Sequence, residues 1–222
     1  MSNHALAERH RLAQLLTAAG PDAPTLCAGW TTRDLAAHLV IRERRPDAAA
    51  GIRVGALAGW TQRVQDEYAA RPYEELVRLF RAGPPVYSPF ALPGADEAAN
   101  TVEYFVHAED VLRAAEDWTA QPVPSGRSEA LWRRLPLIAR LEAGRRSPVR
   151  LALVHPDGRS LTVGPAGSPT VRLTGEPAEL VLFTYGRGAR TALAVDGTPD
   201  AVEALRHVLP LPPKPSPEQS PE

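Results

Sequence analysis

The spacing of apolar residues along this 222-residue chain predicts two kinds of structure in succession. Up to about residue 144, apolar side chains recur every three or four positions, which is the period of a helix with one buried face. From about residue 149 they alternate in short runs separated by glycine, proline and aspartate, which is typical of strands and tight turns. The pattern therefore predicts an α+β protein in which a helical part precedes a small α/β part.

Helix-breaking residues divide the first part into segments. Gly20-Pro21, Pro46 and Pro72 each separate one apolar pattern from the next, and residues 82–95 are too proline-rich for regular structure and predict a long loop. Helices are expected over residues 3–19, 31–45, 55–70, 72–80, 95–116 and 127–144, the last with a kink or break at Pro136.

The second part begins near Ser147-Pro148 with two alternating runs around His155-Pro156-Asp157-Gly158-Arg159, which indicates a hairpin. Strands are expected over residues 149–155, 159–164, 170–175 and 191–197, and helices over 176–188 and 199–209. The chain is thus expected to form a mainly helical domain (1–146), a small α/β domain (147–209) and a proline-rich, charged tail (210–222) that should be disordered.

Composition excludes several classes of protein. A formal net charge of −1 lacks the basic excess of a nucleic-acid-binding protein. The single cysteine, Cys27, cannot form an intrachain disulfide, and the N-terminus lacks an apolar stretch of signal-peptide length. No run approaches the roughly 18 apolar residues of a membrane-spanning helix. We therefore expect a cytoplasmic protein that binds neither membrane nor nucleic acid.

Candidate chemistry is concentrated in the central helix. Glu103, His107 and Asp110 are spaced by four and three residues, so a helix places all three on one face. A carboxylate and an imidazole one turn apart can bind one divalent ion together, with Asp110 either as a third ligand or as the group that orients His107. Taken alone, however, a glutamate four residues before a histidine is common on solvated helix faces.

The second expected helix carries a similar group. His38 lies in an apolar segment, and Asp34 precedes it by four residues. A metal-binding histidine usually donates its other ring N–H to a carboxylate or carbonyl, so Asp34 could orient His38, unless it caps its own helix. A lone histidine in such a segment is more often a satisfied core residue than a ligand. The spacing therefore leaves metal binding as one of two interpretations.

Two segments together resemble a known family. The residues that carry the resemblance are Cys27-x-Gly29-Trp30-Thr31-x-x-Asp34-Leu35-x-x-His38-Leu39 and Val102-Glu103-x-x-x-His107-x-x-Asp110. They are similar to the DinB-like helical bundle of the mycothiol-dependent maleylpyruvate isomerase group, which implies an up-and-down helical bundle over residues 1–146. That group commonly adds a small C-terminal α/β domain, and the segments 175–188 and 193–197 resemble its usual helix–strand unit.

The resemblance implies a divalent ion, usually zinc, bound by His38, Glu103 and His107. Helical spacing would then put Asp110 and Asp34 in the surrounding shell. Three protein ligands are typical of catalytic zinc, because a position stays open for water or substrate. A divalent ion beside one carboxylate carries net positive charge, which favours a coordinated thiolate. The family therefore implies a metal-dependent enzyme, a transferase or isomerase, that uses mycothiol on a small electrophile, with a role in detoxification.

Other residues and functions stay open. Arg42 lies one turn after His38 and Arg113 lies three residues after Asp110, so either arginine could bind an anionic substrate or thiol. Cys27 is expected to be packed rather than catalytic. The alternative functions are a non-catalytic metal-binding stress or interaction module and a metal-dependent hydrolase that needs no thiol. The proline-rich loop shows no match to substrate contacts of the isomerase, so maleylpyruvate is not predicted as the substrate.

Overall fold

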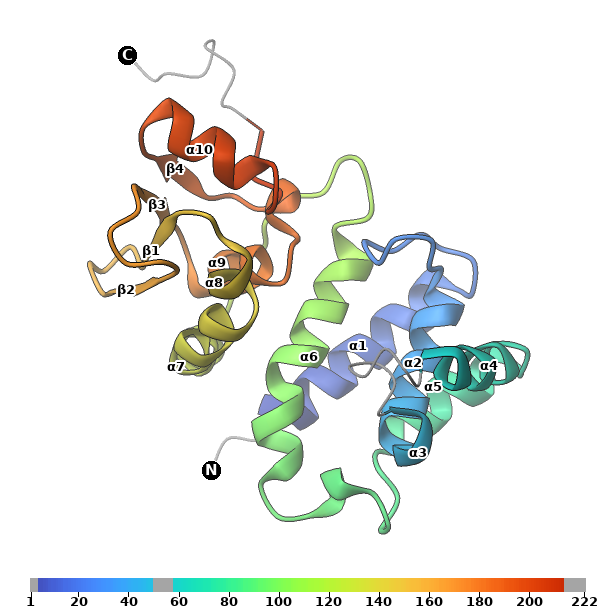
Figure 1. Ribbon diagram of the computed structural model, residues 1–222. Helices are drawn as coiled ribbons and strands as arrows, with labels where there is room; N and C mark the ends of the chain where they lie inside the picture. The colour runs from blue at the N-terminus through green and yellow to red at the C-terminus, as the bar shows by residue number, and fades with distance from the viewer. Residues whose placement is uncertain (1–3, 50–57, 214–222) are drawn as a thin grey trace. The chain divides into compact units, whose positions relative to one another are not determined.

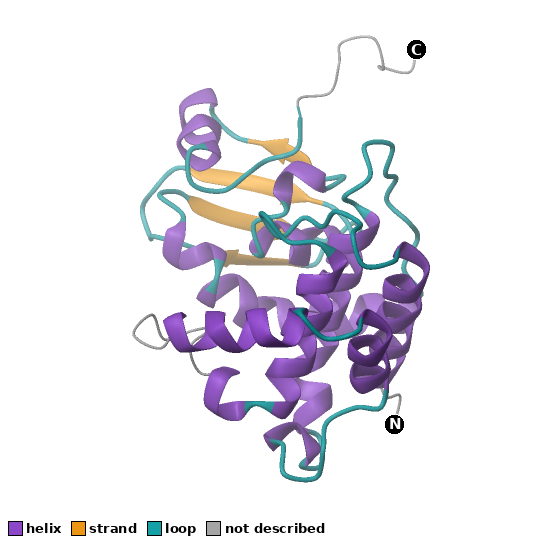
Figure 2. Cartoon of the chain, turned by 90° about the vertical axis from the view of Figure 1, so that its right-hand side faces the viewer, coloured by secondary structure: helices purple, strands orange, loops and turns teal. Residues whose placement is uncertain are grey.

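The computed structural model describes residues 4–49 and 58–213 of the chain. The chain divides into two compact units, Met1–Thr119 and Ala120–Glu222. The first unit is helical and the second contains the sheet (Figures 1 and 2). The α+β class expected from the sequence is confirmed.

The first unit is built from amphipathic helices. α1 packs along α6, α5 packs against α1 and α2, and α2 also packs against α4 (Figure 1). The segment predicted to be a loop contains a 3-10 turn. The bounds are α1 (His4–Ala19), α2 (Thr32–Arg44), α3 (Pro46–Ala49), α4 (Ala58–Ala69), α5 (Tyr73–Arg81), the 3-10 turn (Pro89–Ala91) and α6 (Ala95–Leu112).

The core of this unit follows the helical period of the sequence. Leu12 and Leu16 of α1 are fully buried one turn apart, as are Leu35 and Leu39 of α2. They pack in one cluster with Tyr104 of α6. Each fully buried leucine stabilises the fold by roughly 1.5–3 kcal/mol relative to an exposed one. This cluster fixes which faces of α2 and α6 point inward.

A buried arginine links α1 to α2 and α6. Arg9 of α1 forms an ion pair with Glu43 of α2 and donates to the hydroxyl of Tyr104 on α6 at 3.0 Å. It also donates to Asp96, at the start of α6, at 3.0 Å. Arg9 and Glu43 are each 1% exposed, so leaving either charge without the other would be costly. The network therefore fixes the start of α6 against α1 and α2.

The second unit pairs a four-stranded sheet with helices (Figure 2). The strand order is β2-β1-β3-β4, with β1 parallel to β3 and the other pairs antiparallel. α7 packs against α9, and α10 contacts β3. The bounds are α7 (Ser125–Leu141), α8 (Ala143–Arg146), β1 (Arg150–Val154), β2 (Ser160–Val163), β3 (Thr170–Thr174), α9 (Pro177–Thr184), a 3-10 turn (Gly188–Arg190), β4 (Ala194–Asp196) and α10 (Pro199–Arg206).

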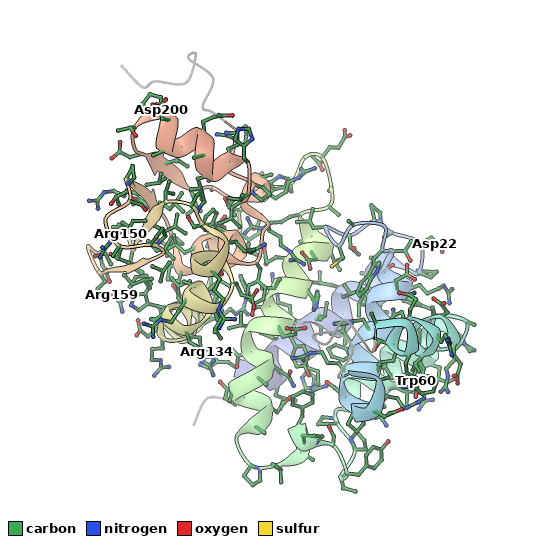
Figure 3. The ribbon with its side chains drawn as sticks, viewed as in Figure 1. Asp22, Trp60, Arg134, Arg150, Arg159 and Asp200 are labelled. Atoms are coloured by element: carbon green, nitrogen blue, oxygen red, sulfur yellow. The ribbon has the colours of Figure 1, made fainter. Side chains whose placement is uncertain are left out.

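Apolar residues alternate with more exposed ones along the strands, which shows which face of the sheet is buried. Leu151 and Leu153 of β1 and Val171 and Leu173 of β3 are fully buried, while the residues between them are partly or fully exposed. The hairpin at residues 155–159 joins β1 to β2 as expected, with Gly158 in the left-handed region at φ 93°. Arg150, labelled in Figure 3, begins β1, and Arg159, also labelled there, lies in the hairpin turn just before β2.

The structure differs from the sequence expectations at several boundaries. The second unit begins at Ala120, so that α7 belongs to it, whereas the sequence placed the boundary after residue 146. Amphipathic periodicity shows that α7 has a buried face but not what covers it. α7 also continues through Pro136 instead of breaking there. α6 ends at Leu112, four residues before its expected end.

Of the expected tail, the structure describes residues 210–213. Leu211 is 3% exposed, so the segment just after residue 209 packs against the second unit instead of being free. Residues 214–222 and the expected helix start at 55–57 lie outside the described residues. Among the described helices, none combines the length and apolarity required to cross a bilayer.

Candidate metal site

α2 presents His38 from a helix whose start is capped. Thr31 donates its backbone N–H (2.9 Å) and its hydroxyl (2.8 Å) to the Asp34 carboxylate, which stabilises the first turn and the positive helix end. His38 follows one turn later and is 8% exposed. Its ring lies 5.2 Å from the ring of Trp30. Local capping and an aromatic neighbour thus position the His38 imidazole.

α6 presents Glu103 and His107 on the face that meets His38. The Nε2 atom of His107 lies 3.3 Å from Oε1 of Glu103, and the Nε2 atom of His38 lies 3.7 Å from the same oxygen. The two imidazole rings meet edge to face at 5.4 Å. Helical spacing within α6 and packing of α2 against the same core therefore bring three possible ligands together.

These three donors fit a divalent transition metal. One ligand atom from each of His38, Glu103 and His107 lies within 4.8 Å of the other two. Bonds of about 2.0–2.2 Å to zinc separate two ligand atoms of a tetrahedral site by roughly 3.3–3.6 Å, so the cluster needs only small side-chain adjustments. Imidazole nitrogen with carboxylate oxygen is a donor set that zinc accepts, whereas magnesium and calcium prefer oxygen alone.

Charge within the cluster favours an ionised carboxylate. Burial by itself would raise the pKa of Glu103, but hydrogen bonds from His107 and His38 and the charge of Arg42 hold it well below its ordinary value. Burial lowers the pKa of His38 below its ordinary value. For His107, burial acts to lower the pKa, but contacts with Asp110, Cys27 and Glu103 raise it well above the ordinary value. The cluster thus holds a carboxylate anion that attracts positive charge.

Asp110 lies where it can orient His107. Its Oδ2 atom is 3.0 Å from Nδ1 of His107, and the residue is fully buried. The thiol of Cys27 donates to the same oxygen at 3.3 Å, and the backbone carbonyl of Asp110 accepts from Leu26 N–H at 3.0 Å. With Nδ1–H directed at a carboxylate, Nε2 of His107 is the nitrogen left facing Glu103. Cys27 and Asp110 also form, with His107, a second cluster of possible ligand atoms.

Two residues predicted to serve the site have other partners in the structure. The Asp34 carboxylate is taken up by Thr31 at the start of α2, so its capping role prevails over the orientation of His38. Arg113 is 2% exposed and donates to Glu109 at 2.7 Å, and Arg11 of α1 donates to the same carboxylate at 2.7 Å. The interpretation of Arg113 as an anion-binding residue is therefore not supported by its position.

Arg42 does lie at the cluster, but its guanidinium is already engaged. Its Nε atom is 3.2 Å from Oε1 of Glu103, and its NH1 group donates to the side-chain carbonyl of Asn100. The ring of Phe90, from the proline-rich loop, lies 5.2 Å from its guanidinium carbon. Asn100 was not predicted from sequence. Its spacing of three residues before Glu103 was the available signal, but its partner lies 58 residues away in the chain.

Comparison with known proteins places the chain in a family. Residues 3–137, more than half of the chain, match the family model of the mycothiol maleylpyruvate isomerase N-terminal domain. The chain belongs to this family. The matched residues include all three candidate ligands, together with Arg42, Asn100 and Asp110. A comparison with curated protein sequences gives no significant match.

Solved structures of the isomerase share the fold. The crystal structure of the mycothiol-dependent maleylpyruvate isomerase aligns with a TM-score of 0.57 at 14% identity, covering 87% of this chain and 90% of that chain. A histidine-to-alanine variant of that isomerase aligns equally well. At this identity the likeness establishes the fold, which includes the helical unit and the sheet-containing unit. It does not by itself transfer the substrate.

Proposed function

We propose that this chain binds a divalent metal ion, with zinc the preferred ion, through His38, Glu103 and His107. The observation that carries the proposal is the convergence of one donor atom from each residue within 4.8 Å. Family membership supports it independently, because the two helices that supply the donors lie inside the matched domain.

We further propose that the protein is an enzyme that uses mycothiol, or a thiol of the same kind, on a small electrophile. A bound divalent ion would favour the deprotonated, nucleophilic form of a thiol that coordinates it. Histidines bind a metal ion as neutral imidazoles, so binding of the ion would release the proton that His107 otherwise holds. Two neutral imidazoles and one carboxylate would leave such a site with net positive charge, which suits an incoming anion. Three protein ligands also leave a position free for that anion. The name of the family, with the thiol in it, supports this interpretation.

The residues of the chain have separate roles in this proposal. His38, Glu103 and His107 hold the ion, and Asp110 accepts the Nδ1 proton of His107, which keeps Nε2 available as a ligand. The partial burial of both histidines limits the access of water to the cluster. Limited water access strengthens electrostatic interactions within the site.

The thiol proposal can be tested spectroscopically. The protein is loaded with Co²⁺ and titrated with mycothiol, and the disulfide form of mycothiol serves as the control because it carries no free thiol. We expect the thiol, and not the disulfide, to change the visible Co²⁺ spectrum and to add a sulfur-to-metal charge-transfer band. A spectrum that saturating thiol leaves unchanged contradicts thiol use. That result, with metal bound, would favour a non-catalytic metal-binding module or a thiol-independent hydrolase.

A further inference from the structure

One buried side chain near the site is connected to a candidate ligand through an arginine. Asn100 is fully buried on α6, three residues before Glu103. Its side-chain carbonyl accepts from NH1 of Arg42, and Nε of Arg42 lies 3.2 Å from Oε1 of Glu103. Asn100 therefore reaches the candidate ligand Glu103 through one guanidinium.

The orientation of the Asn100 amide is determined by its neighbours. Its Nδ2 group donates to Oδ1 of Asp96 at 2.7 Å, and a carboxylate can only accept. Its carbonyl must then face Arg42, because a guanidinium can only donate. Asp96 is itself held by the buried guanidinium of Arg9 at 3.0 Å. The amide is thus fixed at one end by the network that joins α1, α2 and α6.

Arg42 in turn has little freedom. Asn100 holds its NH1 group, Phe90 covers its guanidinium at 5.2 Å, and the side chain is 16% exposed. A carboxylate oxygen has two lone pairs, so Oε1 of Glu103 can accept from Arg42 and still offer the other lone pair to a metal ion. The Arg42 contact would therefore set the direction in which Glu103 presents that lone pair.

We infer that Asn100 is a positioning residue of the metal site, acting on Glu103 through Arg42. This inference rests on the proposed metal binding by His38, Glu103 and His107. It assigns Arg42 to the orientation of a ligand, in place of the anion-binding role that its sequence position suggested. Partners of metal ligands in the surrounding shell typically change metal affinity by about 10–100-fold when removed.

The test compares Co²⁺ binding by the full-length protein with binding by Asn100→Ala, Arg42→Met and the double variant. Asn100 is neutral, so its removal does not change the charge near the metal. We expect Asn100→Ala to weaken Co²⁺ binding about tenfold, at the lower end of that range, and to shift the visible spectrum. Because Asn100 acts through Arg42, Asn100→Ala should add less than a twofold further loss in the Arg42→Met background.

Two controls separate this role from general structural damage. Thr101→Val changes a neighbouring, fully buried polar residue whose hydroxyl donates to the carbonyl of Glu97, and Arg45→Met removes a charge from the same end of α2. Both controls should keep the affinity and the Co²⁺ spectrum of the unchanged protein.

The outcomes are distinguishable. Unchanged affinity and spectrum in Asn100→Ala, or losses that simply add in the double variant, would overturn the inference while leaving metal binding intact. A failure of the unchanged protein to bind Co²⁺ would contradict the metal site itself and with it this inference.

Discussion

At the scale of single residues, the candidate site depends on the partners of the two ring nitrogens of His107. His107 has Glu103 at Nε2 and Asp110 at Nδ1, at 3.3 and 3.0 Å. The ligand and its orienting carboxylate therefore lie on one helix, at spacings that the sequence alone reveals. The sequence did not reveal the partners of Asp34 and Arg113. Each of these side chains had two possible partners at helical spacing, and the sequence does not show which of the two it contacts.

Replacing the orienting carboxylate should weaken metal binding without removing a ligand. We expect Asp110→Asn to lower the Zn²⁺ affinity by about 10–100-fold, because an amide does not hold the Nδ1 proton of His107 as a carboxylate does. Competition with a chromophoric chelator measures the effect. Glu109→Gln is the matched control: it alters the neighbouring buried carboxylate, which pairs with Arg11 and Arg113, and should reduce stability while keeping metal affinity. Equal affinities for Asp110→Asn and the unchanged protein would contradict the role given to Asp110.

A glycine in the second unit has no space for a side chain. A Cβ atom at Gly188 would lie 1.9 Å from the carbonyl oxygen of Pro210, a backbone atom that cannot turn away. We expect Gly188→Ala to lower the free energy of unfolding by about 3 kcal/mol, at the upper end for overpacking. Gly59→Ala, on α4 where nothing lies within 4 Å, is the control and should be neutral or slightly stabilising. Denaturant unfolding measures both variants, and equal midpoints would contradict the close approach of residue 210.

At the scale of elements, a tyrosine hydroxyl joins α5 to the end of α1. Tyr73 is 5% exposed, and its hydroxyl donates to the carbonyl of Leu16 at 2.7 Å. Burial raises the pKa of Tyr73 from 10.0 to about 12. Since the folded-state pKa lies above the unfolded value, this contribution to stability is fully present below about pH 10 and is lost as pH rises through about 12.

Removing that hydroxyl should therefore have a pH-dependent effect. We expect Tyr73→Phe to lower the free energy of unfolding by about 1 kcal/mol at neutral pH, from the lost hydrogen bond. Between pH 10 and 12 the stability of Tyr73→Phe should fall less steeply than that of the unchanged protein. Denaturant midpoints across this range provide the comparison. If the stability of the two proteins fell equally steeply with pH, ionisation of Tyr73 would not be coupled to the packing of α5 on α1.

Most elements could be predicted from sequence, and the reasons for the exceptions are physical. Periodicity located α1, α2, α5 and α6, and alternation with turn residues located the four strands, because burial of one face imposes a period. The continuation of α7 through Pro136 was not visible in this pattern. Neither was the link between Asn100 and Arg42, because long-range pairs leave no periodic signal.

At the scale of the whole molecule, the described candidate site lies within the first unit. His38, Glu103, His107 and Asp110 all precede Thr119, and the matched family domain covers them. The boundary between the units differs from the predicted one because α7 packs against α9, which lies more than 30 residues later in the sequence. The likeness to the isomerase extends over 87% of the chain and so includes the second unit, although the identity of 14% supports only its fold.

The zinc content of the purified full-length protein tests the proposed metal site. We expect one tightly bound zinc ion per chain, and near-complete loss of it in His38→Ala and His107→Ala. His207→Ala, which removes a histidine whose side chain is 75% exposed, should retain the metal. Elemental analysis after dialysis, with circular dichroism to confirm folding, gives the answer. A folded protein without stoichiometric metal, or full zinc retention in both His38→Ala and His107→Ala, would contradict the proposed site.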